Sequence, residues 1–112
     1  DFFVNGMLRG AGLGWTSVAS ANGLPANPME IWGFDGKIPL DAIKPYGAEV
    51  QQQTLDYVAS LKPEDLDREL DTRFFGKQTV AFVLQLAVNH SMGHGGDIAA
   101  VKGMQGLKGL PF

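Results

Sequence analysis

The chain has 112 residues, of which 45% are hydrophobic and 19% are charged, and its formal net charge is −3. These values are typical of an ordinary globular protein, so we expect one domain over residues 1–112 rather than a disordered chain. The basic residues are scattered and the net charge is negative, which argues against nucleic acid and against an anionic membrane surface as partners.

The absence of cysteine excludes a disulfide framework, a thiolate zinc site and a cysteine nucleophile. The opening residues lack the charged and apolar pattern of a signal peptide. The longest apolar stretch, VAFVLQLAV at 80–88, is far shorter than the roughly 20 residues that span a bilayer. We therefore expect a protein without a membrane span and, compatibly with its lack of cysteine, a cytoplasmic one.

The first nine residues have the pattern of the end of a helix, with an apolar stripe formed by Phe2, Phe3, Met7 and Leu8. They begin in this pattern without a helix-start signal, so we expect that an N-terminal piece precedes Asp1. Residues 10–38 are rich in Gly, Asn, Ser and Pro and predict a long connection. We expect its aromatic residues to fix the loop onto the helices, with contact to a ligand as the alternative.

Residues 39–61 form the clearest predicted helix, with Asp41 as the N-cap and Pro45 tolerated only in a first turn. Its buried face is predicted to carry Ile43, Tyr46, Val50, Tyr57, Val58 and Leu61. A short helical turn opened by Pro63 follows, and Thr79 is predicted to cap a last helix over 79–106. No strand alternation is evident, so the predicted class is all-α, most simply an antiparallel bundle.

Both histidines of the chain, His90 and His94, lie four positions apart in this last helix. Residues at i and i+4 share one face of a helix, so the two rings can present nitrogens to one metal ion. Asp97 lies on nearly the same stripe and is a candidate third ligand, or the acceptor that fixes a histidine tautomer.

The competing interpretation is that these histidines are ordinary core residues. Their face also carries Val83, Ala87 and Val101, which indicates that it points inward. Buried imidazoles need partners, and a divalent ion provides them. The glycines at 93, 95 and 96 would then let a neighbouring helix or a ligand approach. Two ligands alone do not hold a metal firmly, and no other histidine exists in the chain.

Three segments together resemble the DinB-like superfamily. HSMGHGGDI (90–98) is similar to the motif H-x-x-x-H-x-G-[QED]-I that closes its domain, and LKPEDLDREL (61–70) resembles the connection before its last helix. KGMQGLKGLPF (102–112) resembles the tail that follows. The resemblance covers the chain well from about Leu55, and the first half only loosely, through DFFVNGMLRG.

The resemblance implies a DinB-like antiparallel four-helix bundle, with the first helix and the start of the second missing here, and a three-histidine metal site. His90 and His94 match two of its ligands, and the third would lie upstream of Asp1. The metal would be a divalent ion, Zn or Ni in the first place. The implied activity is that of a metal-dependent thiol transferase or isomerase, acting on a small molecule with a low-molecular-weight thiol. Gly95 stands where relatives often carry Arg.

Two alternatives to the enzyme remain open. The bundle could be a non-catalytic binding or dimerisation module with core histidines, because the helices at 41–61 and 79–104 are expected to expose a groove that a missing piece or a second copy must fill. We expect a homodimer. A weaker alternative is a small-molecule carrier with an aromatic pocket formed by Trp15, Trp32, Phe34 and Tyr57.

Overall fold

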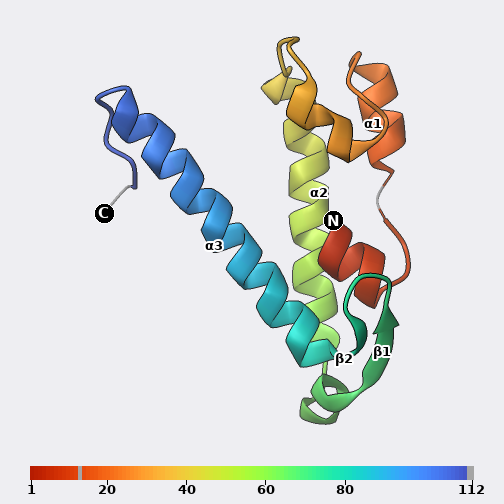
Figure 1. The fold of residues 1–112 in the computed structure, drawn as a ribbon. Helices are drawn as coiled ribbons and strands as arrows, with labels where there is room; N and C mark the ends of the chain where they lie inside the picture. Colours follow the sequence, from red (N-terminus) through yellow and green to blue (C-terminus); the bar gives the residue numbers. More distant parts are fainter. Residues whose placement is uncertain (13, 111–112) are drawn as a thin grey trace.

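The computed structural model, drawn in Figure 1, describes residues 1–12 and 14–110. In chain order the elements are the π-helix η1 (Phe2–Leu8), α1 (Trp15–Ala21), the 3-10 helix η2 (Pro28–Gly33), α2 (Leu40–Ser60), the 3-10 helix η3 (Pro63–Asp67), β1 (Glu69–Thr72), β2 (Gly76–Thr79) and α3 (Val80–Met104). The predicted all-α class is confirmed, since the described strands form only a two-stranded hairpin.

The hairpin was not predicted from the sequence. β1 and β2 pair antiparallel, from Glu69 opposite Thr79 to Thr72 opposite Gly76. Gly76 has a φ of 65°, a left-handed conformation that suits glycine in a tight turn. The Thr72 hydroxyl closes the turn, because it donates to the Gly76 carbonyl at 2.8 Å and accepts from the Phe75 amide at 3.0 Å. The hairpin therefore sets the direction in which the last helix leaves.

α3 begins as predicted. The Thr79 hydroxyl accepts a hydrogen bond from the Phe82 amide at 3.1 Å, so Thr79 is the N-cap. The start of α2 is different: Pro39 is the N-cap position, and Asp41 lies in the first turn, 2.6 Å from Lys44 Nζ. Pro45 lies inside α2 rather than in its first turn. Because proline has no backbone N–H, it makes no hydrogen bond to the preceding turn.

Residues 10–38 are more structured than predicted. They include α1 and η2, and Asn27 caps η2 by accepting from the Met29 amide at 3.1 Å. The Trp15 indole N–H donates to the Pro25 carbonyl at 3.2 Å within this region. The Trp15 ring contacts α2, because its centroid lies 5.8 Å from that of Tyr46. Trp32 is 77% exposed, so the expectation that these aromatic residues are all fixed onto the helices is wrong for Trp32.

The buried hydrophobic residues are few. Among the described residues they are Val4, Ala19, Leu24, Val80 and Val83. In η1, Val4 is buried while Phe2 is 54% exposed, so the predicted apolar stripe is wrong at that end. No residue of α2 is fully buried; of its predicted face, Ile43, Tyr46, Val50 and Tyr57 are half-buried, whereas Val58 is 45% exposed.

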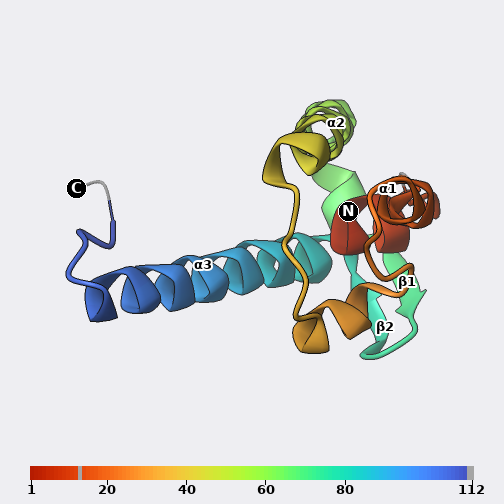
Figure 2. The same cartoon turned by 90° about the horizontal axis from the view of Figure 1, so that it is seen from above.

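Figures 1 and 2 show that α2 and α3 approach each other at the hairpin end and diverge from there, so that most of α3 extends away from the other elements. The radius of gyration, 16.1 Å, is larger than the about 13 Å of a compact domain of this length. Val88, Met92, Ile98, Val101 and Met104 are consequently exposed, each more than half. Apolar side chains are therefore exposed along α3, whereas the predicted groove between the helices at 41–61 and 79–104 stays a prediction. Over residues 1–12 and 14–110, none of the helices combines the length and apolar character that a bilayer crossing requires.

Candidate metal centre and adjoining pocket

The two histidines lie side by side near the middle of α3. His90 Nε2 and His94 Nε2 are 3.0 Å apart, and the ring centroids are 4.4 Å apart with the rings nearly perpendicular. This separation suits an N–H···N hydrogen bond between two neutral rings. It also suits two nitrogens bonded to one ion at about 2.0–2.1 Å each. The helix alone produces this arrangement, because i and i+4 are neighbours on its surface.

Asp97 approaches the far side of the pair. Its Oδ2 lies 3.5 Å from Nδ1 of His94, one helical turn away, and its side chain is 79% exposed. A carboxylate at Nδ1 favours the tautomer whose proton is on Nδ1, which leaves Nε2 as the electron-pair donor. The predicted role as acceptor therefore has a suitable geometry.

The imidazole pair is more exposed than expected. Both histidines are exposed, His94 with 46% of its side chain, so the expectation of an inward, buried face is wrong for this part of α3. The physical reason is the divergence of α3 from α2 at this height. Aromatic residues still border the pair: the Phe3 ring centroid lies 5.1 Å from that of His90, and the Trp32 centroid 6.3 Å from that of His94.

Phe3 belongs to the π-helix η1, whose backbone hydrogen bonds join residues five positions apart. One of them runs from the Gly6 amide to the Asp1 carbonyl at 2.9 Å. Such wide turns are uncommon and often occur at functional sites. η1 packs against both α2 and α3, so it joins the two long helices at the level of the histidines.

A third metal ligand is not present in the described residues: no group of three His, Asp or Glu side chains in residues 1–12 and 14–110 is placed to hold an ion. A ligand upstream of Asp1 stays a prediction. The role predicted for the glycines of this stretch, a close approach of another segment or a ligand, also stays a prediction. A Cβ built on Gly93, Gly95 or Gly96 meets nothing within 4 Å, so no described segment makes the close approach that these residues allow.

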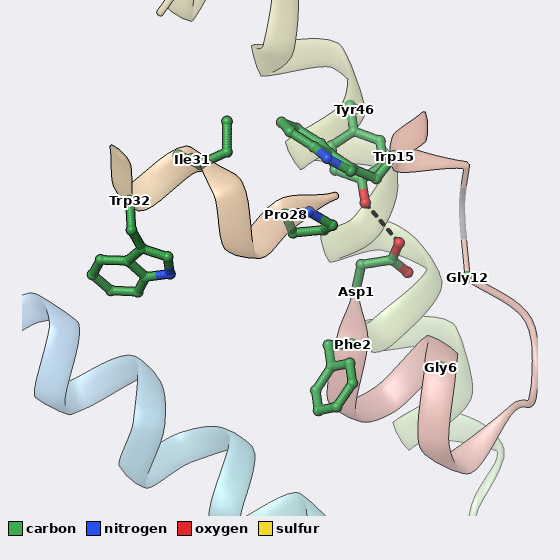
Figure 3. Close-up of a pocket in the computed structure, with 9 residues that line it drawn as sticks. All are labelled: Asp1, Phe2, Gly6, Gly12, Trp15, Pro28, Ile31, Trp32 and Tyr46. Atoms are coloured by element: carbon green, nitrogen blue, oxygen red, sulfur yellow. Dashed lines mark hydrogen bonds between the residues drawn. The ribbon is translucent and has the colours of Figure 1, made fainter. Parts of the chain in front are cut away.

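Next to the imidazole pair lies a pocket of about 500 Å³, drawn in Figure 3. Its lining comes from η1, α1, η2, α2 and the connection before α1, and consists of Asp1, Phe2, Gly6, Gly12, Trp15, Pro28, Ile31, Trp32 and Tyr46. Of the predicted aromatic pocket, Trp15 and Trp32 are in this lining, whereas Phe34 and Tyr57 are not. Trp32 belongs to both features, because its ring lines the pocket and neighbours His94.

One hydrogen bond in the pocket lining joins α2 to the first residue of the chain. The Tyr46 hydroxyl donates to Asp1 Oδ2 at 2.6 Å. Burial, and after it the negative charge of Glu49, raises the pKa of the Tyr46 phenol above its usual value. The hydroxyl is therefore protonated at neutral pH and remains a donor. Sequence reasoning missed this pair, because 45 positions separate the two residues.

Comparison with known proteins gives one family. The family model described as the DinB superfamily matches residues 6–98, which include His90, His94 and Asp97. No curated protein and no solved structure is significantly similar to the chain.

Proposed function

Since the chain belongs to the DinB superfamily, we propose that it is a metal-dependent enzyme in which His90 and His94 hold a divalent ion. The observation that carries the proposal is the 3.0 Å separation of their Nε2 atoms. The finer proposal is a thiol transferase or isomerase that joins or rearranges a small molecule with the help of a low-molecular-weight thiol.

The donor set fits such an ion. Imidazole nitrogen is accepted by both Zn and Ni, and the two Nε2 atoms are already close enough to share one ion without a change of the helix. Asp97 supports this use of the pair, since a carboxylate beside Nδ1 orients the His94 ring and keeps Nε2 available. A further donor from outside the described residues completes the proposed site.

A divalent ion at this position would act as a Lewis acid, which lowers the pKa of a bound thiol or water toward neutral pH. Two features of the chain itself would orient the reactants. Asp97 holds the His94 tautomer, and the pocket bordered by Trp32 places a small molecule beside the imidazole pair.

Metal titration of the complete protein, with any segment that precedes Asp1 included, tests the proposal, because two ligands alone do not hold a metal firmly. We expect Zn and Ni to bind, His90→Ala and His94→Ala each to weaken binding by about 10-fold or more, and the double variant to abolish it. Asn89→Ala is the matched control, because Asn89 is an exposed neighbour on α3 whose carboxamide oxygen accepts a hydrogen bond from Gln85 in the same helix. Equal metal binding by the wild type and the double variant, measured by elemental analysis, would contradict the assignment.

The thiol proposal has its own test. The metal-loaded chain is incubated with a low-molecular-weight thiol and an electrophile, and thiol consumption is followed, with the double histidine variant as the blank. Consumption above the blank supports transfer. Metal binding without any thiol consumption would support the metal site and contradict the transferase activity.

A second candidate is a dimerisation module, and one observation favours it. Val88, Met92, Ile98, Val101 and Met104 expose apolar surface along the part of α3 that extends from the other elements. Exposed apolar surface of this extent is typical of a protein interface. A second copy of the chain is the proposed partner. Light scattering over a range of concentrations tests it, and a mass equal to one chain at every concentration excludes it.

A further inference from the structure

A pocket of about 390 Å³ lies between α1 and α2, and its volume is within the range of small-molecule sites. We call it the α1–α2 pocket. Neither histidine is in its lining, and Tyr46 is the one described residue that it shares with the pocket of Figure 3. Its apolar walls are formed by Val18 and Ala21 from α1 and by Ala42 and Pro45 from α2. The other described lining residues are polar, so their chemistry decides which ligand fits.

Glu49 is the charged residue of this lining. It is exposed, and it forms no ion pair with any residue in the ranges 1–12 and 14–110. Its negative charge reaches Tyr46, because it adds to the effect of burial in raising the pKa of that phenol. A carboxylate attracts a cation, and so does an aromatic ring when the cation lies over its face. The α1–α2 pocket contains both.

No basic group in the described lining compensates the charge of Glu49. Lys and Arg are absent from these residues, and the last turn of α1 contains no basic side chain. Lys44 of α2 lies outside the lining and pairs with Asp41 at 2.6 Å. Asp1, with its carboxylate and its α-ammonium group, also lies outside this lining. A cationic ligand therefore meets no competing cation among the described residues of the pocket wall.

The hydrogen-bonding groups left to a ligand are mostly acceptors. Asn22 Nδ2 donates to the Val18 carbonyl at 2.8 Å, and the Tyr46 hydroxyl donates to Asp1 Oδ2 at 2.6 Å. The available acceptors are Asn22 Oδ1, the Ser17 hydroxyl oxygen and the Glu49 carboxylate, against one N–H of Asn22 and the Ser17 O–H as donors. An ammonium group, which only donates, matches this set better than a carboxylate, which only accepts.

We propose that the α1–α2 pocket binds a small organic cation, an ammonium group attached to an apolar body. Glu49 pairs with the ammonium, Asn22 Oδ1 accepts a hydrogen bond from it, and the ring of Tyr46 adds a cation–π attraction. The apolar body contacts the walls from Val18 to Pro45. The proposal goes beyond the metal site and does not depend on it, because neither histidine lines this pocket.

Three probes of similar shape and different charge test the proposal. The full chain is titrated with cyclohexylammonium, with neutral cyclohexanol and with the anion cyclohexanecarboxylate, and the amide signals in a ¹⁵N–¹H spectrum are followed at constant ionic strength. We expect cyclohexylammonium to shift the signals of Val18, Ala21 and Glu49 with one saturation curve. We expect cyclohexanol to bind at least about 3-fold more weakly, because it lacks the charge that pairs with exposed Glu49, and the carboxylate to bind more weakly still.

A matched pair of charge variants assigns the role of Glu49. Glu49→Gln removes the negative charge and keeps the shape of the side chain, and we expect it to weaken cyclohexylammonium binding by about 3-fold. Glu64→Gln makes the same change at an exposed residue outside the lining, and we expect it to leave the affinity unchanged. This control separates a specific pair from a general attraction of a cation to an acidic chain.

A matched pair of size variants locates the ligand. Ala21→Phe puts a large side chain into the pocket wall without a change of charge, and we expect it to abolish cyclohexylammonium binding. Ala48→Phe makes the same change at an exposed position of α2 outside the lining, and we expect wild-type affinity. If Ala21→Phe fails to fold, the three probes and the two glutamate variants still decide the proposal.

Three results would overturn the inference: lining signals that cyclohexylammonium leaves unmoved, binding of the alcohol or the carboxylate at least as tight as that of the ammonium, or equal losses in the two glutamate variants. Metal binding is measured separately, so the two proposals can fail independently. A chain that binds cyclohexylammonium but no metal would support the α1–α2 pocket and contradict the metal site, and the opposite result would do the reverse.

Discussion

The two halves of α3 have similar residues and opposite surroundings. At its start, Val80 and Val83 are 0% exposed against η1 and the hairpin. From Val88 onward its large apolar side chains are more than half exposed. Val83 and Val101 are separated by 18 residues, which is five helical turns, so they lie on the same face of the helix. The difference between them teaches that the pattern on α3 defines a face, while packing elements decide whether this face is buried.

The histidines lie where the packed half gives way to the exposed half. His90 and His94 share the face of Val83 and Val101, and their contacts are the rings of Phe3 and Trp32 rather than a neighbouring long helix. In this second half, Val88 and Met92 occupy a different face from Val101. A helix that is apolar on several faces is usually buried. This is the physical reason to look for a partner along α3.

The largest effect is expected from a matched pair of substitutions on that shared face. Val83→Asp places a charge in the packed half and should lower the free energy of unfolding by about 4 kcal/mol or prevent folding. Val101→Asp makes the same change in the exposed half and should alter it by less than about 0.5 kcal/mol. Urea unfolding measures both.

The second variant also bears on the dimer. A large loss in Val101→Asp, together with a fall in the mass seen by light scattering, would show that the exposed half is covered in solution. The difference in exposure between the two halves of α3 would then hold for an isolated chain and not for the dimer.

A smaller effect is expected at the N-terminal end of the packed half. Thr79→Ala removes the hydroxyl that accepts from the Phe82 amide and should cost about 1 kcal/mol of unfolding free energy. Ser91→Ala is the control, because the Ser91 hydroxyl donates to the Ala87 carbonyl within the helix and caps no helix end. Comparable losses in both variants, measured by thermal unfolding, would argue that the cap does not anchor α3.

The smallest effect is expected from the glycines of the exposed half. Gly96→Ala should stabilise the chain by about 0.5–1 kcal/mol, because alanine favours a helix and nothing lies within 4 Å of the added Cβ. Chemical unfolding at low and at high protein concentration measures this change. A loss of stability at high concentration alone would indicate that another chain approaches Gly96 closely.

Local signals explain what the sequence could predict. The periods of α2 and α3, the turn at Pro63, the Thr79 cap and the neighbouring histidines all depend on residues a few positions apart, and the structure has each of them. The hairpin was missed because its strands have four residues each and no alternation. α1 was missed because it starts after Gly14, which has no side chain to cap it.

Distant contacts explain the rest. The exposure of His94 depends on where α3 leaves α2, which no pattern within α3 encodes. The pocket brings together residues from separate elements, among them Asp1, Trp15, Trp32 and Tyr46. Of these, the sequence predicted only Trp15 and Trp32 as pocket residues, on the basis of their aromatic side chains. The metal, its third ligand and the thiol stay predictions from the sequence.

The shared position of Trp32 has a thermodynamic consequence. The same indole is a wall of the pocket and a neighbour of His94, so whatever displaces it on one side changes the surroundings of the other. Linkage requires this influence to be reciprocal: if a small molecule in the pocket alters the affinity for an ion by some factor, the ion alters the affinity for that molecule by an identical factor. If an ion and a small molecule both bind as proposed, Trp32 therefore couples the two binding equilibria.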